Sequence, residues 1–273
     1  MNEVLVIGAT GTTGSRVAAF LRERGVQARP ASRRPDLAGH VRFDWTDRDT
    51  HTPALEGVSA VYLVAPVGVS DPVPLVAPFL EEAVRQGVRR VVQLSSSAVP
   101  EGTPGLGAVH SLVRTTMPEW TVLRPSWFMQ NFTGDSLALR ARNGEILSAT
   151  GNGRVAFIDA RDIAAVAGHA LIDEVPHNTG HVLTGPEALT YADAAEIIAQ
   201  RTGGHVRHRA VTAHELAQHF IEQGMAPDFA AMLAALDDDI RGGSEDRVTD
   251  TVERVTGRPP RGFRAFAGFR VSS

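Results

Sequence analysis

The chain has 273 residues, of which 43% are hydrophobic and 21% are charged, and its formal net charge is −4. This length fits either one cofactor-binding domain with a smaller lobe attached or one large single domain, and the acidic balance argues against a nucleic-acid ligand. The sequence has no cysteine, which excludes disulfides and thiolate chemistry, and no apolar run approaches the roughly 18 residues of a membrane span. We therefore expect a cytoplasmic protein with no nucleic-acid or membrane partner.

The first half of the chain alternates short apolar strands with helical segments. Strands are expected at 3–7, 27–30, 41–44, 60–65, 90–95 and 120–124, and helices at 14–24, 50–56, 72–86 and 108–117. Near-continuous apolar strands separated by helices of this length predict right-handed crossovers and a parallel sheet buried on both faces. The predicted fold class is α/β, with a doubly wound parallel sheet.

After residue 124 this alternation ends, and the rest of the chain is expected to add a smaller, mainly helical C-terminal lobe. A strand is expected at 155–158 and helices at 163–172, 194–202, 214–241 and 245–255. Asp162 is the expected N-cap of the first of these helices, and Thr190 with Asp193 resembles a capping box for the second. Residues 1–130 and 154–180 are assigned to a cofactor-binding domain, and residues 131–153 and 181–273 to a substrate-binding lobe.

Three glycines, Gly8, Gly11 and Gly14, lie between the first strand and the first helix. The first permits a tight turn, the second lets the backbone approach a pyrophosphate, and the third lets the helix pack on the strand. The helix N-terminus then offers free N–H groups and the positive end of its dipole to the phosphates. Glycines also serve ordinary turns, but a strand before and a helix after them favour a dinucleotide site of the Rossmann type.

The end of the second strand bears on which nicotinamide cofactor is bound. It reads Ala31-Ser32-Arg33-Arg34 and lacks the acidic residue that would hold the ribose hydroxyls of NAD. An arginine can instead bind the 2′-phosphate of NADP through a planar pair of donors, so NADP is the expected cofactor, and one of the two arginines is expected to be solvated. Asp44, which ends the third strand, either receives the adenine amino group or forms a turn.

Six segments carry a family resemblance. They are VIGATGTTGSRV at 6–17, AVYLVAP at 60–66, VVQLSSSA at 91–98, WTVLRPSWFMQNF at 120–132, FIDARDIA at 157–164 and LTGPE at 183–187. Through them the chain resembles the NmrA-like group of atypical short-chain dehydrogenases, in the branch of festuclavine dehydrogenase-like enzymes and NADPH-dependent quinone reductases. Fold and cofactor carry over from such a resemblance, whereas the substrate does not.

The resemblance implies a role for several residues. The pyrophosphate would be lined by Gly8, Thr10, Gly11, Thr12, Thr13 and Gly14. Arg33 would reach the 2′-phosphate, Asp44 and Trp45 the adenine, and Ala65 and Pro66 the ribose and the nicotinamide edge. Ser95 to Ser97 would face the nicotinamide, while Pro125, Ser126, Trp127 and Phe128 would form a wall between the cofactor and the substrate.

The chain lacks the usual acid of this superfamily, a tyrosine followed four residues later by a lysine, because it contains no lysine. Ser97 matches the catalytic serine position, although a hydroxyl at a strand end is also an ordinary hydrogen-bonding group. His110 is the nearest titratable candidate for a catalytic acid, and the alternative is a helix-surface histidine without a role. We therefore expect a substrate that needs little acid assistance: an iminium ion, a quinone or a conjugated enone.

Apolar side chains from two segments predict the substrate pocket. Trp127 and Phe128 are expected to line it with Met225 and Phe229 of a late helix, and Asn131 is its polar candidate. A place in the core is the alternative for these aromatic and methionine residues. No metal site is expected, because the histidines of His214–His219 are five residues apart and cannot share one helix face.

The predicted function is an NADPH-dependent reductase of an apolar, activated electrophile, with secondary metabolism as a possible setting. One alternative is an NADP-binding sensor that regulates partners without turnover, as the namesake of the family does. Another is a non-redox cyclase or isomerase on the same fold. The missing acid favours the sensor, and the aromatic wall favours the reductase. The sequence decides neither the substrate nor the choice between a monomer and a homodimer.

Overall fold

The computed structural model describes residues 3–33, 39–134, 141–142 and 144–267. The chain forms two compact units, the first from Met1–Pro125 and Ala160–Val182, and the second from Ser126–Asp159 and Leu183–Ser273. Each unit is therefore assembled from two separate stretches of sequence. Among the described residues, no helix combines the length and the apolar character that crossing a membrane requires.

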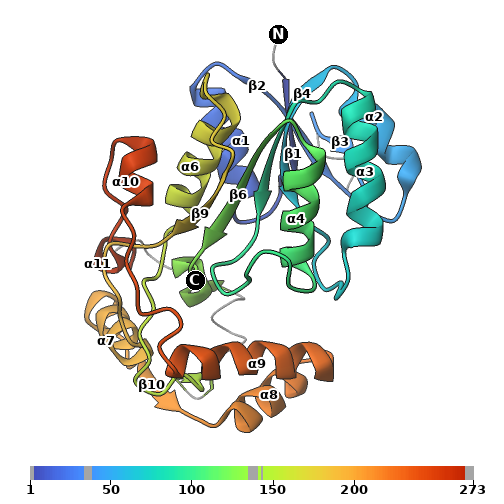
Figure 1. The fold of residues 1–273 in the computed structure, drawn as a ribbon. Helices are drawn as coiled ribbons and strands as arrows, with labels where there is room; N and C mark the ends of the chain where they lie inside the picture. The colour runs from blue at the N-terminus through green and yellow to red at the C-terminus, as the bar shows by residue number, and fades with distance from the viewer. Residues whose placement is uncertain (1–2, 34–38, 135–140, 143, 268–273) are drawn as a thin grey trace. The chain divides into compact units, whose positions relative to one another are not determined.

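The first unit is built on a seven-stranded sheet with the order β3-β2-β1-β4-β5-β6-β9 (Figure 1). Its strands are β1 (Glu3–Ile7), β2 (Gln27–Ser32), β3 (Val41–Arg42), β4 (Val58–Val64), β5 (Arg90–Leu94), β6 (Glu119–Pro125) and β9 (Thr179–Leu183). All neighbouring pairs from β3 to β6 are parallel. The order reverses between β1 and β4, which is the switch point at which sheets of this type bind ligands. The predicted doubly wound fold is confirmed.

Helices cover both faces of this sheet. The helices α1 (Gly14–Glu23) and α6 (Ala160–Ile172) pack together on one face, and α3 (Val73–Arg85) and α4 (Leu106–Thr116) on the other (Figure 1). The short helices η1 (Arg48–Thr50) and α2 (His51–Leu55) lie between β3 and β4. Gly168 brings α1 and α6 together, because a Cβ at this position would lie 2.1 Å from the ring of Phe20.

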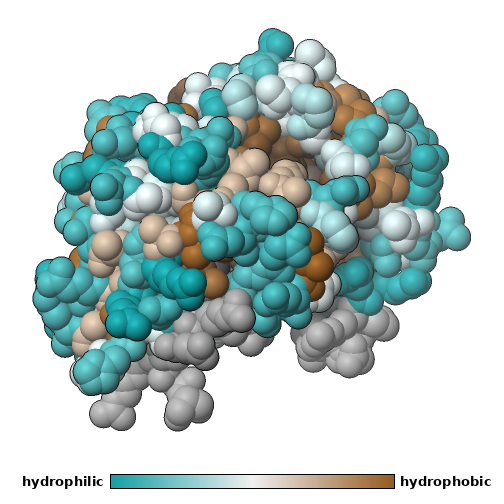
Figure 2. Space-filling view, turned by 90° about the horizontal axis from the view of Figure 1, so that it is seen from below, coloured by the Kyte–Doolittle hydropathy of each residue, from teal (hydrophilic) through white to brown (hydrophobic). Residues whose placement is uncertain are grey.

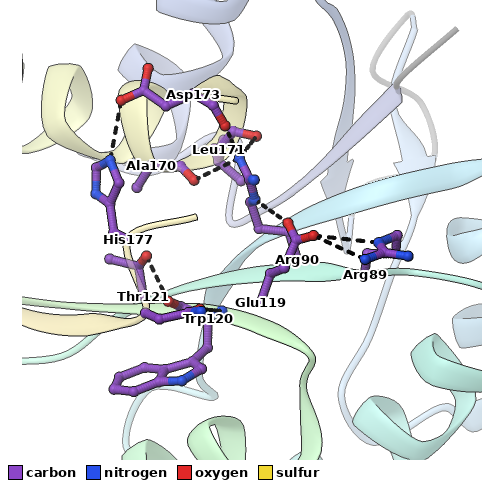
Figure 3. A network of polar contacts seen from close by, with 10 residues as sticks. Arg89, Arg90, Glu119, Trp120, Thr121, Ala170, Leu171, Asp173 and His177 are labelled. Atoms are coloured by element: carbon purple, nitrogen blue, oxygen red, sulfur yellow. Dashed lines mark hydrogen bonds and ion pairs between the residues drawn. The ribbon is translucent and has the colours of Figure 1, made fainter. Parts of the chain in front are cut away.

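A polar network lies at the end of the sheet where its parallel strands begin (Figure 3). Arg90 Nε donates to Glu119 Oε2 at 2.8 Å, and Arg90 Nη1 donates to the carbonyl oxygens of Ala170, Leu171 and Asp173 at 3.4, 3.2 and 2.7 Å. The last carbonyls of a helix have no partner within it, and a cation there offsets the negative end of the helix dipole. Arg90 therefore attaches the end of α6 to β5 and β6.

The second unit contains a three-stranded sheet with the order β10-β8-β7. Its elements are β7 (Ala141–Arg142), β8 (Glu145–Ser148), β10 (Arg207–Ala210), η2 (Met129–Phe132), α7 (Tyr191–Thr202), α8 (Ala213–Glu222), α9 (Pro227–Arg241), α10 (Thr251–Thr256) and α11 (Phe263–Phe266). Ile146 packs in a core with residues of α7, and Leu147 in a core with residues of α8 and α9. Alternate residues of β8 thus serve two faces, as the pleat of a strand requires.

The lobe is mainly helical, as predicted, but its small sheet is absent from the prediction. Strand β10 is polar, and its Arg207 Nε donates to Glu145 Oε1 of β8 at 2.7 Å, so it shows none of the apolar pattern that signals a strand. In place of the expected strand at 155–158, Val155 and Ile158 form isolated bridges with Leu189 and Phe128. Helix α6 begins at Ala160, which places Asp162 in its first turn and not at its N-cap. The capping box of Thr190 and Asp193 is confirmed.

Two late-helix residues that look solvated in the sequence are buried. Asp237 of α9 is fully buried, and its Oδ2 accepts a hydrogen bond from the backbone N–H of Ala149 at 3.0 Å. His219 of α8 is 3% exposed. Helices α8 and α9 pack against each other, so one face of each is covered whatever the charge of its residues.

Candidate cofactor and substrate sites

The glycine turn joins the carboxyl end of β1 to the first turn of α1. Gly8 has φ +72°, a left-handed conformation that favours glycine, and its carbonyl oxygen accepts from Gly11 N at 2.9 Å. A Cβ on Gly14 would lie 2.3 Å from that same oxygen, far inside van der Waals contact. The close approach of α1 to the turn therefore depends on glycine at position 14.

The N-terminus of α1 has no side-chain cap. Its N-cap residue, Thr13, makes no capping hydrogen bond through its side chain, and the first turn holds no acidic residue. The backbone N–H groups of Thr12, Thr13 and Gly14 have no acceptor within the described parts of the chain. Thr10 and Thr12 are exposed. Unpaired N–H groups at the positive end of a helix dipole fit a pyrophosphate.

Arg33 lies directly after β2 and is exposed, while its neighbour Arg34 lies outside the described residues. The carboxylate of Asp44 accepts from Thr46 N at 2.9 Å and from Thr46 Oγ1 at 2.8 Å. These two hydrogen bonds hold the pKa of Asp44 below its usual value, and the nearby Arg33 and Arg42 lower it further. Asp44 forms a turn through one of its oxygens, and its charge lies close to Arg33.

Trp45 belongs to the aromatic packing beside the sheet. Its Nε1 donates to the carbonyl oxygen of Val64 at 3.2 Å, and its ring meets those of Phe43 and Phe79 edge-on at 5.0 and 5.2 Å. The indole remains half-buried. It therefore fixes the end of β4 and leaves part of its ring uncovered.

Ala65 and Pro66 follow β4 directly, beside the glycine turn. A Cβ built on Gly8 would lie 3.5 Å from the side chain of Val64, the last residue of β4. Ala65 is 6% exposed, whereas Pro66 is half-buried. The structure therefore brings these residues and the glycine turn to the same point of the sheet.

The serines Ser95 and Ser97 extend β5 beyond its last residue alongside β6. Ser95 N donates to Leu123 O at 2.7 Å, and Ser97 N donates to Pro125 O at 2.9 Å. Arg124 donates to the carbonyl oxygens of Ser96 and Ser97 at 3.4 and 3.1 Å, a positioning role that the sequence reasoning missed. The only signal for it in the sequence is its place at the end of a buried strand.

His110 lies in the interior and not on the helix surface. It is 4% exposed, its ring centroid lies 5.8 Å from that of Trp120, and neither ring nitrogen has a hydrogen-bond partner in the described structure. Burial lowers its pKa, and Glu101, whose Oε2 is 3.8 Å from Nε2, offsets part of that effect. In this conformation protein atoms cover both ring nitrogens.

In the second unit, Ser126, Trp127 and Phe128 form the segment that leads into η2. Ser126 is 2% exposed, and its hydroxyl has no partner among the described residues. Trp127 O accepts from Ile158 N at 2.9 Å, and Phe128 O accepts from Asn131 N at 3.0 Å. Trp127, Phe128 and Asn131 are half-buried, so their backbone is fixed while part of each side chain stays accessible.

A fully buried carboxylate holds η2 in place. Asp159 Oδ1 accepts from Gln130 Nε2 at 2.9 Å, and its Oδ2 accepts from Arg261 Nη1 at 2.8 Å. Gln130 lies within the segment of Trp127 to Asn131, so Asp159 orients that segment. The sequence carries no signal for this link, because Asp159 and Arg261 are 102 positions apart.

Met225 and Phe229 are both expected in one late helix, but Met225 lies between α8 and α9. Met225 packs against the core of α8 and α9, whereas Phe229 on α9 is 37% exposed. The neighbouring Met232 is 49% exposed. No group of three His, Asp or Glu residues in the described ranges could hold a metal ion.

A family model described as NAD(P)H-binding matches residues 8–174, which include the whole glycine turn and the strands β2 to β6. The chain belongs to this NAD(P)H-binding family. The chain is 52% identical to the oxidoreductase YesF of Bacillus subtilis over 271 residues, which cover 97% of the chain and 94% of that relative. It is also 38% identical to agroclavine dehydrogenase of Claviceps purpurea over 278 residues, or 97% of the chain and 96% of that enzyme.

Solved structures agree in fold. The NADPH-dependent quinone oxidoreductase of Escherichia coli, complexed with NADPH, matches with a TM-score of 0.82 at 22% identity, covering 97% of this chain and 98% of that one. The predicted resemblance to the NmrA-like group and the expectation of an oxidoreductase with a nicotinamide cofactor are confirmed.

Proposed function

We propose that the protein is an NADPH-dependent reductase that transfers a hydride to an apolar, activated electrophile: an iminium ion, a quinone or a conjugated enone. The observation that carries this proposal is an intact, uncapped glycine turn in a chain without any lysine. Such a chain can hold a hydride donor but lacks the acid pair with which related enzymes protonate a carbonyl oxygen.

The cofactor side of the proposal rests on the first unit. The N–H groups of Thr12, Thr13 and Gly14 would bind the pyrophosphate, and the exposed guanidinium of Arg33 would bind the 2′-phosphate with charge-assisted hydrogen bonds. When bound, NADPH supplies the hydride from its nicotinamide ring. The segment of Ser95 to Ser97, fixed by Arg124, would contact the nicotinamide side.

The buried titratable groups favour an electrophile that needs no protein acid. Tyr62 is fully buried, and burial raises its pKa further. Tyr191 is 1% exposed, and both nitrogens of His110 are covered. Hydride addition to an iminium ion gives a neutral amine without a proton. A quinone becomes a hydroquinone monoanion and an enone becomes an enolate, and each then takes one proton, which water can supply. Ser97 then acts through hydrogen bonding, and not as the acid.

The substrate side of the proposal rests on Trp127, Phe128, Asn131, Met225 and Phe229, with Ser126 as a buried hydroxyl beside them. Aromatic surface with one amide suits a planar, apolar ligand. A relative named agroclavine dehydrogenase and a structural neighbour named NADPH-dependent quinone oxidoreductase support this substrate class.

The test is anaerobic titration with NADPH and NADH, followed by stopped-flow oxidation of the bound NADPH. The acceptors are 1,4-naphthoquinone, an N-methyl-dihydroisoquinolinium ion and cyclohexenone. We expect tighter binding of NADPH than of NADH and rapid oxidation by at least one acceptor. Tight binding without oxidation by any of them would contradict the reductase and favour a cofactor sensor or a non-redox enzyme.

A further inference from the structure

We propose that the loop of residues 66–71, which follows β4, recognises the substrate, and that Val67 and Val69 bind the apolar body of the electrophile. This inference rests on the proposed function and adds two specificity-determining residues to it. It is based on two exposed apolar side chains that lie near the glycine turn within the first unit.

The two valines are conspicuously exposed. Val67 is 88% exposed and Val69 is 41% exposed, although they are only two positions apart. The molecular face in Figure 2 is mostly hydrophilic, with hydrophobic residues in small groups. Isolated exposed apolar residues are ordinary, whereas a pair of them beside a ligand site indicates a contact surface.

The loop begins at the switch point of the sheet. It leaves β4 next to the glycine turn, since Gly8 lies against the side chain of Val64. Ligands of doubly wound sheets bind outside the carboxyl ends of the strands at this point. Val67 and Val69 are therefore near the cofactor site without belonging to the phosphate-binding turn.

Both ends of the loop are held, and its tip is free. At one end Ala65 is buried, and at the other Asp71 Oδ1 accepts from Val73 N at 3.2 Å, at the start of α3. Gly68, between the two valines, has φ +80°, and a Cβ built on it would meet nothing within 4 Å. The valines thus sit on an anchored loop, and in the described structure no packing covers its tip.

The chemistry of these side chains selects an apolar occupant. A valine offers no hydrogen bond to a phosphate or a ribose, so it contributes to binding only when it leaves water against an apolar surface. Its contribution then grows with the apolar area of the ligand. A bicyclic quinone should depend on these residues more than a monocyclic one does.

The experiment compares Val67→Ser and Val69→Ser with Val175→Ser in the intact protein. Val175 is a matched control because it is 75% exposed and lies between α6 and β9, at the edge where the strands begin. Steady-state kinetics would use 1,4-naphthoquinone and 1,4-benzoquinone, and a fluorescence titration would give the Kd of NADPH.

We expect Val67→Ser to lower kcat/KM for naphthoquinone about tenfold, mainly through KM, with a smaller loss for benzoquinone. The Kd of NADPH should stay unchanged, and Val175→Ser should match the wild type. Unchanged kinetics in the loop variants, or equal losses in Val175→Ser, would overturn substrate recognition by the loop but would not contradict the proposed reductase. A wild-type protein that binds NADPH and reduces no acceptor would instead overturn the proposed function, and this inference with it.

Discussion

At the two ends of the parallel strands in the seven-stranded sheet, the termini of the neighbouring helices differ in how their backbone groups are satisfied. At the edge where the strands begin, Arg90 satisfies three carbonyl groups at the end of α6 and an acidic neighbour (Figure 3). At the edge where the strands end, the first turn of α1 has unpaired N–H groups and no side-chain cap. Unsatisfied backbone groups normally cost stability, so their retention here supports the proposed cofactor site.

Arg90→Ala should give the largest effect and act on stability alone. It leaves Glu119 with the exposed Arg89 as its one ion-pair partner among the described residues and uncaps α6, so the free energy of unfolding should fall by about 3 kcal/mol. Urea unfolding monitored by circular dichroism would measure this. The Kd of NADPH, measured on the folded variant, should remain at the wild-type value, and a tenfold loss would contradict the division of roles between the edges.

Gly14→Ala should reduce both the stability of the protein and its affinity for NADPH. The added Cβ overlaps the carbonyl oxygen of Gly8, so we expect a loss of about 2 kcal/mol in unfolding free energy and a weaker affinity for NADPH. The control is Gly25→Ala, which lies just beyond the other end of α1. Its φ of +71° strains an alanine, so stability should also fall, but its Cβ would meet nothing within 4 Å. Equal NADPH affinities for the two variants would contradict the proposal that the glycine turn binds the pyrophosphate.

Arg33→Ser should weaken NADPH binding by about 2 kcal/mol, or roughly 30-fold, because a charge-assisted contact to the 2′-phosphate is lost. NADH binding and stability should not change, since Arg33 is exposed. Arg22→Ser, on α1, serves as the control for the loss of one positive charge. An equal loss for both cofactors would show that Arg33 does not read the 2′-phosphate.

His110 should make the protein sensitive to acid, with the smallest effect. Burial lowers its folded-state pKa below the reference value of 6.5, so the unfolded chain binds more protons in acid. Its contribution to stability is complete above pH 6.5 and is lost as the pH falls through the lower folded-state pKa. His110→Leu should reduce the difference in unfolding free energy between pH 7.5 and 5.5 by about 1 kcal/mol.

His51 adds acid sensitivity of the same sign, since burial also lowers its pKa, so the His110 variant should retain part of the effect. A pH dependence identical to the wild type in His110→Leu would show that the ring is accessible to protons in the folded state.

The cofactor half was predictable because its signals are local. Gly8, Gly11 and Gly14 are close in sequence, and the strand and helix around them have regular apolar patterns. The second unit was less predictable, since β10 is polar and its partner β8 lies about 60 positions earlier. Its pairing depends on contacts that no local pattern reports.

The sequence by itself determined the doubly wound sheet, the glycine turn and the absence of a tyrosine–lysine acid, because each follows from residue type and short-range spacing. Only the tertiary structure decided that His110 and Asp237 are buried, since burial depends on which helices pack over a residue. It also decided that Asp159 joins Gln130 to Arg261 and that Val67 stays uncovered. These properties arise from distant segments brought together, and local sequence does not encode them.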